Sequence, residues 1–237
     1  MRVDGTYILL IIGAVITLIA SAKVKLTFNK YKNKHTANGI TGAQAAAMIL
    51  RLNGINDVCI NAIPGNLTDN YNPKTNSLNL SEAVYGRASI GAVAVAAHEC
   101  GHAIQHHSDY APIRLRSALV PYANIGSKIG IPIVILSWWL GLEFQMSNGS
   151  YFSLATVGIW LFSLAIAFQL VTLPVEFDAS ARALKILRTE NILNSEEMKG
   201  ARKVLTAAAL TYVAAAASSV LQLIRLVLLN DRRGRRS

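Results

Sequence analysis

The pentapeptide His98-Glu99-Cys100-Gly101-His102 combines residue types and a spacing that can bind a metal ion and transfer a proton. Two histidines four residues apart lie on one face of a helix, one turn apart, so both imidazoles can bind one zinc ion at about 2.0–2.1 Å. The carboxylate beside them can take a proton from zinc-bound water, whose pKa zinc lowers towards about 7. Gly101 has no side chain, so substrate or a neighbouring backbone can approach there. A helix with structural histidines on a polar face is the alternative, but the complete motif favours a zinc site with Glu99 as catalytic base.

A zinc ion that catalyses hydrolysis takes a third protein ligand and keeps its fourth position for water. His106 continues the same helical stripe, but it lies roughly 12 Å along the axis from His98, so we interpret it as a surface or cleft histidine. Glu143 follows the motif at the far end of the next apolar run. Glu176 is the better candidate, because two long apolar runs lie between it and the histidines. If both runs cross a membrane, the chain returns to the side that holds the histidines. The alternative role of Glu176 is that of an ordinary carboxylate near a helix N-terminus.

The composition places this motif in a membrane protein. The chain has 237 residues, of which 52% are hydrophobic and 15% charged, whereas soluble domains are about a quarter charged. The net charge is +10, and the cations flank apolar runs, which indicates a lipid bilayer as partner and argues against nucleic acid. Cys59 and Cys100 are the only cysteines; they form no disulfide framework and fit a reducing compartment.

Apolar runs and turn residues divide the chain into segments. The first run precedes Lys23 and Lys25 without a small-residue cleavage site, so we expect an uncleaved anchor, with a signal peptide as the alternative. Lys128 interrupts the second run and Arg225 the last. The expected segments are an N-terminal membrane anchor at 7–22, a catalytic domain at 23–118, a transmembrane hairpin at 120–173, a helix with the third zinc ligand at 174–203, a C-terminal transmembrane or membrane-associated helix at 204–229, and a basic tail at 230–237.

Shorter elements are expected to position the motif. The segment Ser77 to Val84 reads as a strand or sheet edge that can pair with an extended substrate, and Pro174 is expected to close the hairpin. The other expected elements are a helix capped by Thr41 that ends near Asn53-Gly54, a strand at Val58 to Ile63, a turn cluster at Asp69 to Pro73, and a helix from Ala88 through the motif to about His107.

Four blocks, in this order, resemble the YugP-like family of neutral zinc metallopeptidases, which is related in plan to the HtpX-type membrane proteases. The blocks are Leu67-Thr68-Asp69-Asn70-Tyr71-Asn72-Pro73, Leu80-Ser81-Glu82, Ala97-His98-Glu99-Cys100-Gly101-His102-Ala103-Ile104-Gln105 and Leu173-Pro174-Val175-Glu176-Phe177-Asp178-Ala179-Ser180. The likeness covers nearly the whole chain. It implies a mostly α, multi-pass membrane protein with a small α+β zincin-like (gluzincin) domain, one zinc ion held by His98, His102 and Glu176, and Glu99 as base.

The sequence departs from the HtpX-type pattern at one position. Those enzymes carry an acidic residue four positions after the ligand glutamate, whereas Ser180 stands there in this chain and the acid is Asp178. We hypothesise that Asp178 orients a ligand histidine from outside the metal's own ligand set. Arg182 is a candidate for stabilising an oxyanion, and a surface arginine is the alternative.

The sequence therefore predicts a membrane-anchored zinc endopeptidase that acts on a protein or peptide substrate. Two other interpretations stay open. One is an intramembrane protease of the site-2 type, although no Asp-Gly motif occurs in a later apolar run; the other is a metal-binding membrane scaffold without activity.

We expect a multi-pass protein of the cell membrane. The lysines that follow the first run favour a cytoplasmic catalytic domain. If all four runs cross, however, the basic tail Arg232-Arg233-Gly234-Arg235-Arg236 ends outside, against the same rule. Either the last run does not fully cross or the simple count of spans fails.

Overall fold

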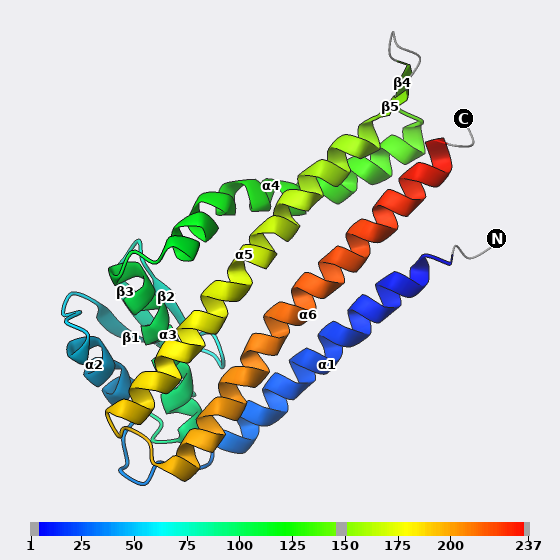
Figure 1. The fold of residues 1–237 in the computed structure, drawn as a ribbon. Coiled ribbons are helices and arrows are strands. Elements are labelled where there is room, and N and C mark those ends of the chain that lie inside the picture. Colours follow the sequence, from blue (N-terminus) through cyan, green and yellow to red (C-terminus); the bar gives the residue numbers. More distant parts are fainter. Residues whose placement is uncertain (1–4, 146–150, 235–237) are drawn as a thin grey trace. The chain divides into compact units, whose positions relative to one another are not determined.

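The fold is mostly helical in the computed structural model, which describes residues 5–145 and 151–234 (Figure 1). The last three residues of the predicted basic tail lie outside that range. In chain order the elements are α1 (Tyr7–Tyr31), α2 (Gly42–Leu52), β1 (Cys59–Ile63), β2 (Asn70–Asn72), β3 (Ser77–Ser81), α3 (Ile90–His107), α4 (Ala111–Leu140), β4 (Glu143–Gln145), β5 (Tyr151–Ser153), α5 (Leu154–Thr189) and α6 (Ser195–Gly234).

The chain forms two compact units, and four long helices contribute to both. The helical unit consists of Met1–Ile19, Arg114–Thr172 and Tyr212–Ser237. The motif unit, named here for the His-Glu-x-x-His motif that it contains, consists of Ala20–Ile113 and Leu173–Thr211.

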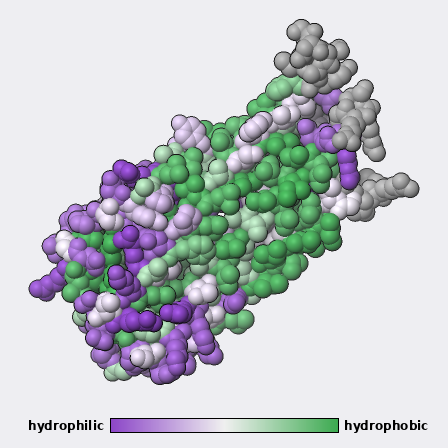
Figure 2. Space-filling view, in the orientation of Figure 1, coloured by the Kyte–Doolittle hydropathy of each residue, from purple (hydrophilic) through white to green (hydrophobic). Residues whose placement is uncertain are grey.

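Helices α1, α4, α5 and α6 are each long and apolar enough to cross a membrane. In the helical unit they pack through small residues: a Cβ added to Gly130 would lie 2.9 Å from the Phe162 nitrogen, and one added to Gly13 would lie 2.6 Å from Ser218 Oγ. Close approach at small residues is typical of packing between membrane helices. Large apolar side chains such as Leu18 point outward, and Figure 2 shows hydrophobic residues gathered along the helices. The helical unit therefore presents the surface expected of a protein that contacts lipid.

A three-stranded sheet lies in the motif unit, with the strand order β1-β3-β2. Strand β3 pairs in parallel with β1 and antiparallel with β2. The prediction that Ser77 to Val84 is a sheet edge open to a substrate strand is therefore wrong, because β3 is hydrogen-bonded on both sides. The edge next to it is β2, which forms within the segment Asp69 to Pro73 that we expected to be a turn cluster.

Local capping chemistry fixes two of the shorter helices. The Thr41 side chain accepts a hydrogen bond from the Gln44 backbone and the Gln44 side chain bonds back to the Thr41 backbone, so α2 begins with a capping box. Gly54, one residue beyond the C-cap, has a φ of +72°, which glycine adopts without strain. Ser89 caps α3, because its side chain accepts a hydrogen bond from the Ala92 backbone N–H. The predicted helix at Gly42 and the helix through the motif are both confirmed.

The prediction that Pro174 closes the hairpin is wrong, because no helix ends there. Helix α5 continues through Pro174 to Thr189. Proline removes one backbone donor from a helix interior, but such a loss is tolerated in apolar helices whose neighbours satisfy the freed groups. Glu176 therefore lies on the continuation of a long helix and not after a break.

Candidate metal centre

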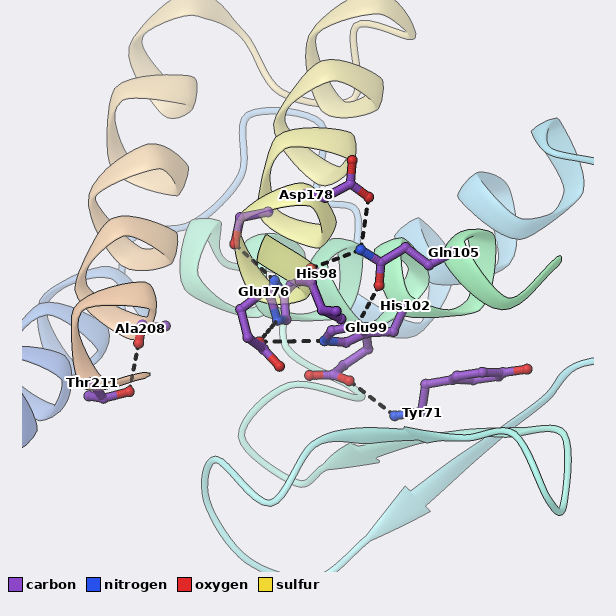
Figure 3. A network of polar contacts seen from close by, with 11 residues as sticks. Tyr71, His98, Glu99, His102, Gln105, Glu176, Asp178, Ala208 and Thr211 are labelled. Carbon is purple, nitrogen blue, oxygen red and sulfur yellow. Dashed lines mark hydrogen bonds and ion pairs between the residues drawn. The ribbon is translucent and has the colours of Figure 1, made fainter. Parts of the chain in front are cut away.

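Two helices of the motif unit bring three ligand groups together. Helix α3 carries His98 and His102, and the last part of α5 carries Glu176; one ligand atom from each lies within 4.8 Å of the others. Glu176 Oε2 is 3.2 Å from His98 Nε2 and 3.6 Å from His102 Nε2 (Figure 3). The Glu176 side chain is 2% exposed and each imidazole 12%. The three groups therefore form a nearly enclosed cluster that can hold one metal ion.

The separations between Glu176 and the two histidines fit a zinc site. With ligand bonds of about 2.0–2.1 Å in a tetrahedral site, the ligand atoms stand roughly 3.3 Å apart, and both separations from Glu176 are of that size. The two imidazole rings are nearly perpendicular, at 83°. Two nitrogens and one carboxylate oxygen form the donor set of hydrolytic zinc sites, which leave a fourth position open.

Each histidine makes a second hydrogen bond through the ring nitrogen that faces away from the cluster. His98 Nδ1 lies 3.1 Å from Ser180 Oγ, and His102 Nδ1 lies 3.0 Å from Gln105 Oε1. With Nε2 turned to a metal, each Nδ1–H donates, and such bonds fix the ring orientation and tautomer. Ser180 stands where the HtpX-type pattern has an acid and directly contacts a histidine. Sequence reasoning missed Gln105, although its position three residues after His102 on one helix was a usable signal.

Asp178, which we hypothesise to orient a ligand histidine, reaches His102 only through another residue. Gln105 Nε2 donates to Asp178 Oδ2 and to the Val175 carbonyl, both at 2.8 Å. These two bonds use both N–H groups of the amide and so direct its oxygen towards His102. Asp178 is therefore linked to His102 by hydrogen bonds through Gln105, which is fully buried. Arg182 donates to Asp178, and its role towards an oxyanion stays a prediction.

Replacing Gln105 with leucine is expected to lower zinc affinity by about 10–100-fold, the usual cost of losing an outer partner of a ligand histidine. Asp178→Ala is also expected to lower zinc affinity, because the Gln105 amide loses one of its two hydrogen-bond acceptors. Competition with a fluorescent zinc chelator measures both effects. Lys185→Ala, at an exposed position of α5, is the matched control. Unchanged affinity in both variants would show that this chain of hydrogen bonds does not support the metal.

Glu99 lies beside the cluster, and its carboxylate is held by the sheet. Its Oε2 accepts a hydrogen bond from the Tyr71 backbone N–H at 3.0 Å. Burial raises the pKa of Glu99 above its usual range, the positive charge of His98 and His102 opposes that shift, and Glu176 adds to it. A carboxyl group with a raised pKa suits a proton acceptor that must later release the proton near neutral pH.

The carboxylate of Asp69 joins the block that begins at Leu67 to the block that begins at Leu80. Asp69 accepts hydrogen bonds from the Ser81 backbone N–H at 2.7 Å and from its hydroxyl at 3.0 Å. Burial raises the pKa of Asp69, and the two bonds partly offset that shift. This contact ties the start of β2 to the end of β3, and thereby positions Tyr71 against Glu99. His106 packs its ring against Tyr71, at 5.5 Å between centroids, and is not one of the three grouped ligands.

The glycine of the motif allows the two helices to meet. A Cβ added to Gly101 would lie 2.5 Å from the Ala179 carbonyl oxygen, which confirms the expectation that a neighbouring backbone approaches there. Any larger residue would push α5 and Glu176 away from the histidines. Cys100 points in the other direction: it is buried, its thiol donates to the Ala46 carbonyl at 3.7 Å, and burial raises its pKa. The cysteine therefore packs α3 on α2 and does not face the cluster.

A helix with two histidines and a buried glutamate, completed by a carboxylate from a second helix, is the arrangement of zinc-dependent hydrolases. Comparison with known proteins agrees. The family described as "Putative neutral zinc metallopeptidase" matches residues 6–231. A relative, the "Putative membrane protease YugP" of Bacillus subtilis (strain 168), is 43% identical over 224 residues, which cover 94% of this chain and 96% of the relative.

The chain therefore belongs to this neutral zinc metallopeptidase family, and the predicted resemblance is confirmed. Zinc as the cofactor follows from the family, and His98, His102 and Glu176 can hold it. Four apolar helices and the membrane protease relative agree with the predicted association with a membrane. No solved structure matches the chain significantly.

Proposed function

We propose that the chain is a membrane-anchored zinc endopeptidase, with a gluzincin-like motif unit as its catalytic part. The observation that carries this proposal is the convergence of three ligand atoms, within 4.8 Å of one another, beside the buried carboxylate of Glu99. His98, His102 and Glu176 hold the metal, and Glu99 handles the proton. The membership of the family supports a peptidase activity.

The residues around the metal perform the proton transfers of peptide hydrolysis. A bound zinc ion supplies a Lewis acid and lowers the pKa of water. Glu99 accepts a proton as water attacks the peptide carbonyl and then gives the proton to the leaving amine. The Tyr71 N–H holds one carboxylate oxygen, which leaves the other free for this transfer. Strand β2, which among the described strands pairs only with β3, is the sheet edge beside Glu99 and the one we assign to an extended substrate.

The motif unit is proposed to face the cytoplasm. Lysines at positions 23, 25, 30, 32 and 34 follow the apolar part of α1, and positive residues concentrate on the cytoplasmic side of membrane helices. Helix α3 is not among the four helices long and apolar enough to cross a membrane in the described part of the chain. That finding favours a site at the membrane surface over an intramembrane protease.

Removing and restoring the metal tests the proposed activity. Protein purified in detergent is expected to contain about one zinc ion per chain and to cleave an unfolded protein substrate. A chelator is expected to abolish cleavage, and stoichiometric zinc to restore it, because the three side chains provide the site. Mass spectrometry of the products distinguishes internal cleavage from removal of terminal residues. Bound zinc without cleavage of any unfolded substrate would instead favour the scaffold.

A further inference from the structure

A cavity that is open to the surface lies between α1 and α6 in the motif unit; most of its lining residues are exposed, and none of them belongs to the metal centre. Its volume of about 540 Å³ is within the roughly 300–1,000 Å³ of small-molecule pockets. Helix α1 contributes residues from Lys23 to Tyr31, and α6 contributes residues from Arg202 to Ala207. The helices meet closely beside it, where a Cβ added to Gly200 would lie 2.6 Å from the Tyr31 ring.

Four cations line this cavity, and none of its described lining residues is acidic. The cations are Lys23, Lys30, Arg202 and Lys203. None of them forms an ion pair within the described part of the chain, whereas Lys199, one turn earlier on α6, pairs with Glu196 at 2.6 Å. Thr27 and Thr206 add hydroxyl groups. Such a set of donors fits a phosphate, whose several oxygens can bind more than one cation.

The rest of the wall is apolar. Leu26 lines the cavity and is 70% exposed, and the Tyr31 ring and Ala207 complete the surface. A free phosphate ion gains nothing from these side chains. A molecule with a phosphate at one end and hydrocarbon at the other satisfies both parts of the wall.

The cavity also lies where both helices change from polar to apolar sequence. On α1 the apolar run Tyr7 to Ala22 ends directly before Lys23, and on α6 the apolar run begins with Val204 directly after Lys203. Both helices are long and apolar enough to cross a membrane. Cations at such a boundary lie at the level of lipid headgroups.

We propose that this cavity binds the headgroup of an anionic phospholipid. Arg202, Lys203 and Lys23 hold the phosphate, and the apolar part of the lipid lies towards Ala207 and the apolar run of α6 that begins at Val204. The site does not depend on the proposed peptidase activity, since it uses none of the residues assigned to it. It makes the motif unit selective for membranes rich in anionic lipid.

Native mass spectrometry of the delipidated full chain, titrated with phosphatidylglycerol or phosphatidylcholine of the same acyl chains, tests the proposal. The wild type is expected to bind phosphatidylglycerol tighter by on the order of tenfold. Arg202→Gln with Lys203→Gln is expected to remove that preference. Lys185→Gln with Arg188→Gln removes the same charges from exposed positions of α5 and is expected to keep it. Equal binding of the two lipids by the wild type, or an unchanged preference in the α6 double variant, would overturn the proposal.

Two further arms separate the cavity from other sources of binding. Thr206→Trp fills the space without changing any charge, so it is expected to weaken phosphatidylglycerol binding; unchanged binding would place the lipid on the outer surface and overturn the cavity site. Excess inorganic phosphate is expected not to displace the lipid. Displacement would show that a soluble anion suffices and would overturn the assignment to a lipid. Circular dichroism verifies that each variant keeps its helix content.

Discussion

Glu99→Gln is expected to abolish peptide hydrolysis while leaving bound zinc unchanged. The glutamine has nearly the same shape, and its oxygen can still accept the Tyr71 N–H that Glu99 accepts at 3.0 Å. It cannot accept a proton from water, and loss of a general base costs about 10²–10⁴-fold in rate. Glu99 is not one of the three grouped ligands, so zinc content should stay at the wild-type level. Cleavage rate and zinc content, measured on the same preparation, check both parts.

The control for this variant removes a carboxylate without touching the site. Glu190→Gln changes an exposed glutamate just beyond α5 and is expected to keep both zinc and activity. Burial raises the pKa of Glu99, so its ionised carboxylate lowers the stability of the folded protein at neutral pH. In the absence of metal, the melting temperature of the glutamine variant should therefore be no lower than that of the wild type. Cleavage that survives Glu99→Gln would assign the proton transfers to another group.

The sequence predicts those parts of the site that depend on residues close together in the chain, such as helical spacing and helix caps. The spacing of His98 and His102 fixes their common face on any helix, and the capping residues fix where such helices begin. Gln105 could have been found by the same reasoning, because it is three residues from His102 on the same helix. Asp178 was proposed from the sequence, but its hydrogen bond to Gln105 could not be predicted, because that contact joins positions 73 residues apart.

The elements that were predicted wrongly depend on tertiary context. Pro174 has a strong local tendency to end a helix, but α5 continues through it, and the residues directly after it, Val175 and Glu176, are buried. Strand β2 is three residues long and lies among asparagines and a proline, so its local sequence favours a turn. Pairing with β3 and the bond from Tyr71 to Glu99 make it a strand. The position of a sheet edge is a property of the assembled sheet, which no single segment encodes.

Glu176→Gln is the second variant with a large expected effect, and it tests the ligand that sequence spacing alone does not identify. Glu176 is the only carboxylate in the ligand group and is almost fully buried. A neutral amide is a much poorer ligand for zinc than a carboxylate, so zinc affinity should fall by more than the roughly 10–100-fold that an outer partner contributes. Activity should fall with it. Chelator competition measures the affinity, and circular dichroism verifies the fold.

Two companion variants make the result specific to position 176. Glu143→Gln removes the other carboxylate considered as a third ligand; it is exposed in β4 and should keep wild-type affinity. Glu176→Asp keeps the charge but is one methylene shorter, so its oxygen falls short of the two Nε2 atoms and its affinity should lie between the wild type and the glutamine variant. If Glu176→Gln binds zinc like the wild type, Glu176 is not the third ligand, and its contacts with the two histidines are an ion pair only.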